Sequence, residues 1–309
     1  MNGILALWKP AGITSHDCVY KLRKILGTKK VGHTGTLDPA VTGVLPIMIG
    51  KATKLSEYMT ATGKMYEAVI CLGSTTTTED ATGEVVETKA LVGDISPVEI
   101  EAALAALTGE ITQIPPLYSA VKVNGRKLYE YARLGLEVER PERQVTIHAL
   151  ERLDEGVVNA ANPSFKIRID CSKGTYVRTL AVMLGELLGY PAHMEDLVRT
   201  MSGTFTRKDC ITLEELNEWK ATGEPADFLY DMMLAVKDLT QIHLSDEAHL
   251  TVKHGGSLTA EQVQEQPGDT TTLRALIHHD VLVAVYKPHP TKEGMWKPEK
   301  MILKTNGSI

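Results

Sequence analysis

The sequence lacks the features that mark a metal-binding, disulfide-linked or membrane protein. Its 309 residues include four cysteines, and no two of them form a CxxC pair. Isolated cysteines exclude a disulfide framework or a zinc site recognisable from spacing, and they fit a reducing compartment. No run approaches the roughly 20 apolar residues that span a bilayer, and Lys9 ends the first apolar run too early for a secretory signal. We expect a cytoplasmic protein with no membrane association and no metal site.

A nucleotide-binding motif is also missing. Gly50-Lys51 resembles the end of a phosphate-binding P-loop, but that motif requires glycine at position 45 and serine or threonine at position 52. The sequence has Leu45 and Ala52 there. We therefore expect no nucleoside triphosphate site and no cofactor.

Composition favours a folded protein of two domains. Hydrophobic residues make up 43% and charged residues 23% of a chain that is long for one domain. The net charge of −6 is unevenly distributed: residues 1–60 carry +5 and 121–180 carry +3, whereas 61–120 carry −7 and 181–240 carry −6. A fold that brings the two basic blocks onto one face would attract phosphates there. Scattered, solvated charges explain the same arithmetic equally well.

Periodicity predicts a mixture of helices and strands. Apolar spacing and capping residues predict helices over about 14–26, 53–59, 98–107, 126–134, 175–188 and 212–219. Strands are expected over 4–8, 65–72, 117–123, 145–153 and 165–171. Residues 31–50, rich in Gly, Thr and Pro, predict a long ordered loop. After about residue 236, short β-like segments at 241–244, 275–277, 281–286 and 301–303 suggest a small β domain.

The segment Gly32–Pro39 contains the residues that best suit catalysis. Asp38 is the only formal charge between Lys30 and Lys51. By itself, Asp-Pro is more often a turn whose carboxylate caps nearby backbone N–H groups. A single carboxylate in an otherwise uncharged loop of a basic block also suits a nucleophile, so both interpretations stay open at this level.

The motifs around Asp38 resemble those of a known family. The run GHTGTLDPAVTGVLPI at 32–47 closely resembles the signature of the tRNA pseudouridine synthase B family, which acts on uridine 55 of the T loop. Other family landmarks follow in order, from Lys9-Pro10 near the start through the runs at 64–66, 115–122, 174–180 and 197–200. The resemblance covers residues 1 to about 210 and is weak over roughly 240–309.

The resemblance implies an α+β fold with a mixed, largely antiparallel sheet flanked by helices and a small C-terminal β-rich PUA-like domain. It implies a catalytic domain over 1–238, including an RNA-contacting insertion over about 122–152, and a PUA-like RNA-binding domain over 239–309. The implied activity is isomerisation of uridine 55 of tRNA to pseudouridine by base flipping and an Asp nucleophile, without cofactor. The expected partner is the T arm of tRNA, bound by a monomer without guide RNA or protein partner.

The resemblance also assigns site residues. It makes Asp38 the catalytic carboxylate and Arg178 its ion-pair partner, which would lower the pKa of the aspartate. It places Tyr66 against the target uracil, with Tyr176 and Leu197 completing the pocket, and gives His33 a role in holding the T loop open. Apart from the resemblance, either tyrosine is more simply a half-buried strand residue and Leu197 a core residue.

The segment 122–133 interleaves cations with aromatic residues. Lys122, Arg126 and Lys127 lie close to Tyr129 and Tyr131, a pattern that suits a nucleic-acid contact. Without context, an exposed helix with one apolar face is the simpler explanation. The family resemblance implies that this region folds over the RNA.

Two further functions stay open at this level. One is a non-catalytic RNA-binding or RNA-folding protein that uses the same surface. The other is a relative that modifies a different RNA. Asp38 discriminates against the first alternative, because a protein that only binds phosphates has no need of a carboxylate in a basic cleft.

Overall fold

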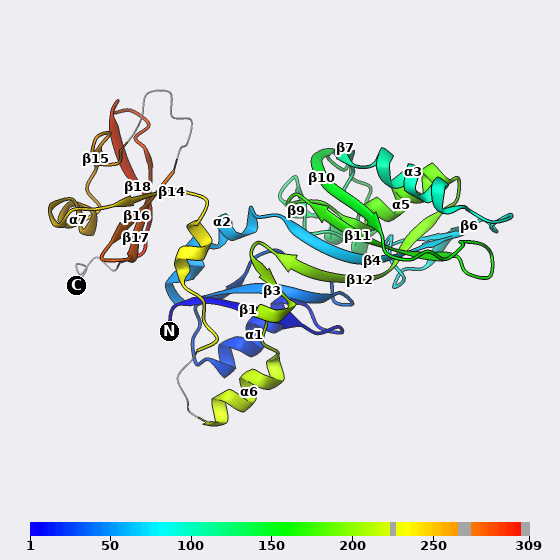
Figure 1. Cartoon of the computed structure of the whole chain (residues 1–309), viewed down its shortest axis with the longest axis horizontal. Coiled ribbons are helices and arrows are strands. Elements are labelled where there is room, and N and C mark those ends of the chain that lie inside the picture. The colour runs from blue at the N-terminus through cyan, green and yellow to red at the C-terminus, as the bar shows by residue number, and fades with distance from the viewer. Residues whose placement is uncertain (223–226, 265–272, 304–309) are drawn as a thin grey trace.

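The structure is a computed structural model that describes residues 1–222, 227–264 and 273–303. It is elongated, with the N-terminal region near the middle, a large sheet towards one end and a smaller sheet at the other (Figure 1). Within the described residues, no helix has the length and apolar character needed to cross a membrane.

The helices of the described residues are short and distributed along the whole chain. They are α1 (Ser15–Ile25), α2 (Ser56–Thr60), α3 (Pro97–Ala106), α4 (Leu128–Leu134), α5 (Val177–Leu188), α6 (Leu213–Thr222) and α7 (Asp246–Lys253), with 3₁₀ turns η1 (Gly50–Leu55), η2 (Arg207–Asp209) and η3 (Met232–Val236). Reciprocal capping boxes precede α1 and α3, formed by Thr14 with Asp17 and by Ser96 with Glu99. These caps explain why the sequence located both starts.

Nine strands form the large sheet. Its main path runs β1-β3-β12-β4-β11-β10-β7, with β2 beside β3 and β13 beside β12; only β3 and β12 pair in parallel. The strands are β1 (Gly3–Lys9), β2 (Val31–His33), β3 (Thr42–Ile49), β4 (Lys64–Leu72), β7 (Gly109–Gln113), β10 (Arg143–Arg152), β11 (Ser164–Cys171), β12 (Ala192–Ser202) and β13 (Phe205–Thr206). The mixed, largely antiparallel sheet is confirmed.

A second, five-stranded sheet follows in the C-terminal part of the chain. Its order is β14-β16-β17-β18-β15, and only β14 and β16 are parallel. Its strands are β14 (Thr240–His243), β15 (Leu258–Thr259), β16 (Arg274–His278), β17 (Val281–Pro288) and β18 (Met295–Met301); two small hairpins elsewhere join β5 (Ser74–Thr76) to β6 (Val85–Thr88) and β8 (Lys122–Val123) to β9 (Arg126–Lys127).

Alternation along the strands divides the core into layers. In β1, Leu5 and Leu7 pack with the core that contains α1, α3, α5 and α6, whereas Ile4 and Ala6 face the opposite side. That opposite side shares one buried cluster with Leu282 of the C-terminal sheet. The two sheets are therefore joined by a continuous apolar contact.

Three sequence-based expectations about secondary structure are wrong. Residues 31–50 are not one loop, since only residues 34–41 lie between β2 and β3. The buried residues Val44–Ile49 belong to the strand β3, although Pro46 lies within it. Residues 117–121 are irregular, so the expected strand over 117–123 shrinks to β8. The last strand ends at Met301, where the sequence predicted one to begin.

Pro46 is tolerated because sheet pairing is interrupted beside it. On that side of β3, β2 pairs with positions 47–49 and β12 with positions 42–43. The Pro46 carbonyl accepts a hydrogen bond from the Thr34 N–H (3.0 Å) on this side. The N–H that proline lacks would point into the same gap, so no ladder bond is lost.

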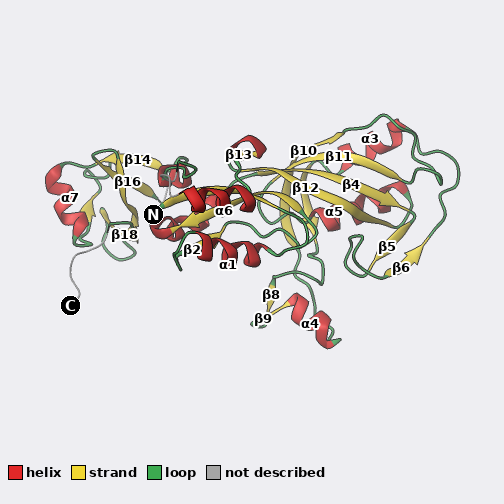
Figure 2. Ribbon diagram, turned by 90° about the horizontal axis from the view of Figure 1, so that it is seen from below, coloured by secondary structure: helices red, strands yellow, loops and turns green. Residues whose placement is uncertain are grey.

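The expected insertion over about 122–152 consists of two different parts. Residues 143–152 are β10, a strand of the large sheet. Residues 122–134 form β8, β9 and α4, which project away from that sheet (Figure 2). We call residues 117–134 the projecting segment.

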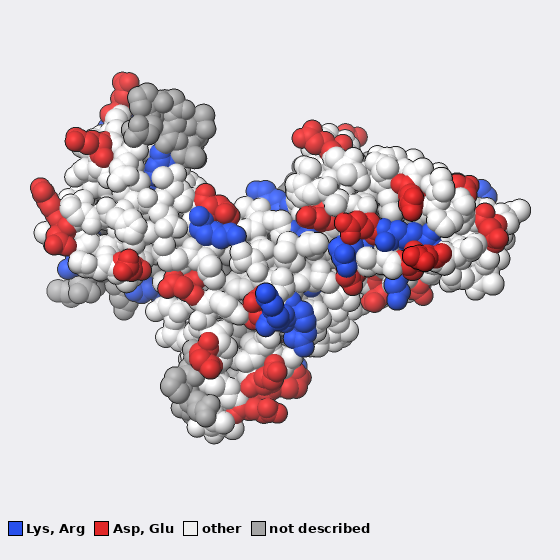
Figure 3. Space-filling model, viewed as in Figure 1, with Lys and Arg blue, Asp and Glu red and all other residues white. Residues whose placement is uncertain are grey.

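Charges of both signs are interspersed on one broad face. Lysine and arginine side chains there lie next to acidic ones, and the described residues form no continuous basic surface in that view (Figure 3). Ion pairs between strands of the large sheet are consistent with such mixing: Arg168 pairs with Glu67 at 3.1 Å and with Glu151 at 3.3 Å. On this face, the scattered-charge alternative describes the distribution better.

Candidate active site

Asp38 lies in a tight turn that leads into β3. The Val41 N–H donates to the Asp38 carbonyl (3.1 Å), which closes a four-residue turn with Pro39 at its second position. The Gly12 N–H donates to the Pro39 carbonyl (2.9 Å) and ties the turn to the segment after β1. The turn interpretation of Asp-Pro is thus correct for the backbone. The Asp38 carboxylate is free to point elsewhere.

Buried polar groups hold this loop from behind. The Lys9 side chain is fully buried, and its Nζ donates to the carbonyls of Val41 (2.7 Å), Pro39 (3.1 Å) and Pro10 (2.9 Å). Ser15 Oγ accepts from the Leu37 N–H at 2.9 Å. Burial lowers the pKa of Lys9, and the three carbonyls compensate for its desolvation.

Arg178, in the first turn of α5, binds the Asp38 carboxylate. Its Nη2 lies 3.1 Å from Asp38 Oδ2, and its side chain is 7% exposed whereas that of Asp38 is 41% exposed. Nη1 donates to the Thr78 carbonyl and Nη2 to the Tyr118 carbonyl, both at 3.1 Å. Asp80 Oδ2 lies 3.8 Å from Nη1 on the other side. The expected ion pair is present.

The net pKa shift of Asp38 is opposite to the one expected. Burial raises the pKa of the Asp38 carboxyl, and the charge of Asp80 adds to the increase, while Arg178 counteracts it. The expectation that Arg178 sets the pKa below its usual value is therefore wrong in its net direction, because desolvation outweighs the ion pair. Arg178 instead limits how far the pKa rises.

A cavity of about 440 Å³ opens in front of Asp38. It unites four predicted site residues with the carboxylate, namely Tyr66, Tyr176, Arg178 and Leu197. The pairing of β4 with β12 places Tyr66 opposite Arg199 and Ala68 opposite Leu197, and Tyr176 directly precedes α5. Burial raises the pKa of the Tyr66 phenol, which keeps it protonated at neutral pH.

Two cations in the cavity wall had no predicted role. Arg199 is fully buried; its Nε donates to the Val44 carbonyl (2.7 Å) and its Nη2 to the Gly35 carbonyl (3.1 Å). Burial, followed by the charge of Arg199, lowers the pKa of Lys64 to about 8. Both residues lie in runs that match the family, but spacing alone gave no reason to separate them from core positions.

Gly43 permits the close approach of β3 and β12 that brings Arg199 into the wall. Its φ is +126°, and a Cβ there would lie 2.2 Å from the Arg199 carbonyl oxygen. Any side chain at position 43 would push the two strands apart. Gly43 therefore allows β3, which follows the Asp38 turn, to pack directly against the strand that carries Arg199.

The projecting segment supplies the opposite wall. Tyr118, Ser119, Ala120 and Tyr129 line the cavity, and the Tyr129 N–H donates to the Ser119 carbonyl at 3.1 Å. Tyr129 was predicted only as part of a charged pattern, and Tyr118 only as part of a motif. Neither signal indicated that both reach the cavity.

The remaining predicted residues lie outside the cavity wall. Lys122, Arg126 and Lys127 are on β8 and β9; Lys122 and Arg126 are exposed, and Lys127 is half-buried, with its Nζ 5.3 Å from the ring centre of Tyr129. His33 is on β2, where burial lowers its pKa. Its Nδ1 is buried and has no hydrogen-bond partner among the described residues.

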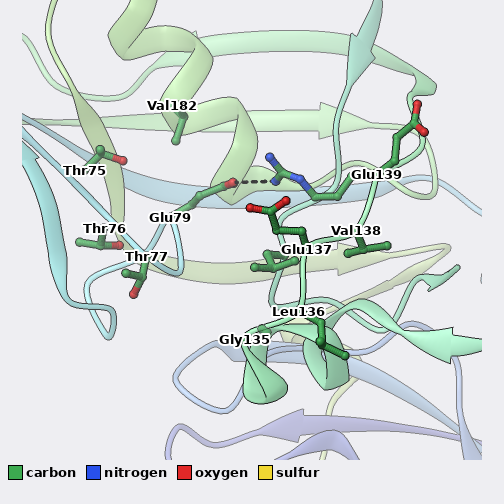
Figure 4. Close-up of a pocket in the computed structure, with 13 residues that line it drawn as sticks. Thr75, Thr76, Thr77, Glu79, Gly135, Leu136, Glu137, Val138, Glu139 and Val182 are labelled. Carbon is green, nitrogen blue, oxygen red and sulfur yellow. Dashed lines mark ion pairs between the residues drawn. The ribbon is translucent and has the colours of Figure 1, made fainter.

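A second cavity, of about 900 Å³, lies between α5 and the chain that follows α4. Figure 4 shows Glu79 on one side and Glu137, Val138 and Glu139 on the other. Glu79 accepts from the Thr179 hydroxyl (2.9 Å) and lies 4.0 Å from Arg140. Asp38 does not line this cavity, so the smaller cavity is the better candidate for chemistry.

The smaller cavity can perform nucleophilic chemistry on a planar ring. It presents a carboxylate oriented by a guanidinium, next to tyrosine rings, within a wall of fixed donors. Among the described residues, no group of His, Cys, Asp and Glu at this cavity is arranged to hold a metal ion. Asp38 is the one carboxylate among the described residues that line this cavity.

Comparison with known proteins agrees with this arrangement. Residues 23–177 match the N-terminal domain of TruB family pseudouridylate synthases, and residues 178–241 match the tRNA pseudouridylate synthase B C-terminal domain. The chain is similar to tRNA pseudouridine synthase B of Listeria monocytogenes, with 58% identity over 306 residues, and to that of Bacillus subtilis, with 50% identity over 305 residues. Each alignment covers 98% of both chains.

Solved structures show the same fold. A Cbf5–Nop10–Gar1 complex contains a chain with a TM-score of 0.74 and 31% identity, matched over 98% of this chain and 85% of the other. An H/ACA RNP bound to a substrate RNA containing 2′-deoxyuridine gives a TM-score of 0.72 and 28% identity, over 98% and 86%. Fold, cavity and sequence together define an enzyme, an isomerase of the pseudouridine synthase class. The chain belongs to the TruB family.

Proposed function

We propose that this enzyme converts uridine 55 in the T loop of tRNA to pseudouridine, with Asp38 as the nucleophile and without a cofactor. The observation that carries the proposal is the Asp38 carboxylate, paired with Arg178 at 3.1 Å at the edge of a tyrosine-lined cavity. Support for tRNA comes from the names of the Listeria and Bacillus relatives. A reaction on tRNA places the enzyme in the cytoplasm.

The size of the cavity supports the proposal of base flipping. A volume of about 440 Å³ accommodates one nucleoside but not a stacked loop. The target base of a folded T loop must therefore leave its stack, at a cost of a few kcal/mol, before it meets Asp38. Tyr66 offers a ring for the flipped uracil to stack against, and Tyr176 and Leu197 close the remaining sides.

The proposed reaction rearranges one nucleoside without a net change in composition. The C1′–N1 bond breaks, the uracil turns, and a C1′–C5 bond forms while the proton on C5 is lost and N1 gains one. Asp38 supplies the nucleophile, Arg178 keeps it oriented, and Tyr66 lies beside the uracil at the C5 side. His33 contacts the RNA outside the cavity and holds the T loop open.

We propose that residues 1–238 are the catalytic domain and 239–309 a PUA-like RNA-binding domain, and that a single chain acts alone. The similarity to chains from complexes named with Nop10 and Gar1 is a similarity of fold. On this proposal, the cations of the projecting segment and the C-terminal domain supply contacts to the T arm, and no guide RNA is required.

The decisive experiment incubates the purified chain with an unmodified T-arm hairpin. Pseudouridine is mapped by carbodiimide modification and primer extension, and a hairpin with cytidine at position 55 serves as the control. We expect a stop one nucleotide to the 3′ side of position 55, in the first hairpin only. Binding without product would favour the RNA-folding alternative, and product at another uridine would favour a different RNA target.

A further inference from the structure

Three side chains of the C-terminal sheet region lie together. They come from α7, β16 and the turn after β16, at the end of the molecule opposite to β7 and β10 (Figure 1). Asp246 is the first residue of α7, His278 ends β16, and His279 begins the two-residue turn to β17. His278 Nε2 lies 2.8 Å from Asp246 Oδ1, and His279 Nε2 lies 3.6 Å from the same oxygen. All three potential ligand atoms lie within 4.8 Å of one another.

We infer that Asp246, His278 and His279 bind a divalent transition-metal ion, with zinc as the expected occupant. Two imidazole nitrogens and one carboxylate oxygen are ligands that zinc accepts, and a fourth position stays open to water. Bonds of about 2.1 Å at tetrahedral angles separate neighbouring ligand atoms by roughly 3.4 Å. The observed separations of 2.8 and 3.6 Å bracket that value, so small side-chain rotations suffice.

A fourth residue, His249, supports this inference. Its ring stacks on that of His278 with 3.8 Å between centroids and 7° between planes. Its Nδ1 is buried and has no hydrogen-bond partner among the described residues. Stacking of this kind fixes the plane of the His278 ring, which a ligand imidazole requires.

The backbone at the turn adds an independent indication. His279 and Asp280 both have positive φ, 47° and 59°, in a two-residue turn that ordinarily favours asparagine or glycine. Histidine in this conformation carries a conformational cost, and such costs concentrate where a side chain has a task. This backbone conformation brings the His279 imidazole beside Asp246.

Binding requires a simple exchange at His278. A neutral imidazole that donates from Nε2 to Asp246 carries its proton on Nε2. The metal ion takes the place of that proton between nitrogen and carboxylate, and the imidazole carries its proton on Nδ1 instead. Spacing along the chain does not reveal this cluster, because Asp246 and His278 are 32 residues apart.

The experiment titrates the full chain, without a histidine tag, with Zn²⁺ by calorimetry and with Co²⁺ by visible absorption. The parent should bind one equivalent of zinc at this site and give the intense cobalt bands of a four-coordinate site. Asp246→Asn and His279→Ala each remove one ligand at an exposed position and should weaken zinc binding at least tenfold. His254→Ala, at the exposed end of α7, is the matched control and should bind like the parent.

The four cysteines could also bind zinc, and the two variants distinguish binding by thiols from binding at Asp246, His278 and His279. Binding that persists unchanged in both Asp246→Asn and His279→Ala would assign the metal to thiols and overturn the inference. A parent that binds no zinc would overturn it as well. The result does not depend on the proposed function, because pseudouridine formation is not part of the measurement.

Discussion

The two walls of the candidate active-site cavity are held in place by different means. The Asp38 loop has fully buried polar anchors behind it, with Lys9 donating to three carbonyls and Arg199 to two. In the projecting segment, α4 buries only Leu128, and its short hairpin pairs only with itself. Arg178 touches both walls, through the Asp38 carboxylate and the Tyr118 carbonyl.

This contrast suits two different roles, catalysis for the wall that contains Asp38 and RNA binding for the projecting segment. A nucleophile benefits from a site whose dipoles and charges are fixed before the substrate arrives. A wall that must receive a folded RNA benefits from few fixed contacts, since it can adjust to the loop. Substitutions in the first wall should therefore affect turnover, and substitutions in the second should affect binding.

Asp38→Asn should have the largest effect. The amide keeps the shape of the carboxylate but is not a competent nucleophile, so single-turnover formation of pseudouridine should fall at least about a thousandfold, roughly 4 kcal/mol in the barrier. Affinity for the same T-arm hairpin should stay nearly unchanged. A variant rate within about tenfold of the parent, roughly 1.4 kcal/mol, would remove Asp38 from the nucleophile's role.

Arg178→Lys should come next, with a loss of about a hundredfold in rate, because an ammonium cannot reproduce the planar fork of guanidinium contacts. Activity requires ionised Asp38, so it is present above the pKa of Asp38 and is lost as the pH falls through it. Arg178 opposes the burial that raises this pKa. The neutral variant Arg178→Gln removes that charge, so the acid limb of its pH–rate profile should move to higher pH, whereas Arg178→Lys keeps the charge and should move the limb less. An unmoved limb in Arg178→Gln would show that Arg178 does not act through the charge of Asp38.

Lys9→Met should destabilise the fold and lower turnover together. The variant keeps an unbranched stem but leaves the carbonyls of Pro10, Pro39 and Val41 without their donor. Unsatisfied buried carbonyls cost about 2–4 kcal/mol in unfolding free energy, which denaturant titration measures. Lys21→Met, at an exposed position of α1, is the control and should unfold like the parent.

The sequence indicated the residues that line the cavity around Asp38 much better than the buried residues that hold this cavity in shape. Asp38 stood out as an isolated charge, and the residues that the family resemblance indicated, Arg178, Tyr66, Tyr176 and Leu197, line the same cavity. The direction of the Asp38 pKa shift could not be predicted, because it depends on how deeply the fold buries the carboxylate.

Long-range pairing explains most of the remaining differences. Pro46 and Gly43 hid the strand β3: Pro46 is tolerated because neither β2 nor β12 pairs with it, and Gly43 allows the close approach of β12. The sequence assigned no structural role to Arg199 and Lys9, and the fold buries both side chains completely. No local pattern contains that information.

Neutralising Lys122, Arg126 and Lys127 together as glutamines should weaken hairpin binding while leaving the single-turnover rate at saturation within a few fold. Each lost phosphate contact should reduce the slope of log K against log salt by roughly 0.7–0.9. The matched triple variant Lys21→Gln, Lys24→Gln and Lys237→Gln removes equal charge elsewhere and should keep the parent slope. An unchanged slope in the first variant would place the projecting segment away from the RNA.

Removal of metal ions should have the smallest effect, close to none on turnover. The described groups around Asp38 include no cluster able to hold an ion, and the histidine cluster at α7 lies towards the other end of the molecule (Figure 1). EDTA should therefore strip any zinc from the C-terminal sheet region and leave pseudouridine formation unchanged on a pre-folded hairpin. The pre-folded hairpin matters, since magnesium also stabilises RNA structure. Turnover that is lost in EDTA and restored by one metal would contradict the proposal that Asp38 works without a cofactor. It would also mean that a metal ion acts in the reaction although the described residues of neither wall of the cavity form a cluster of ligands for it.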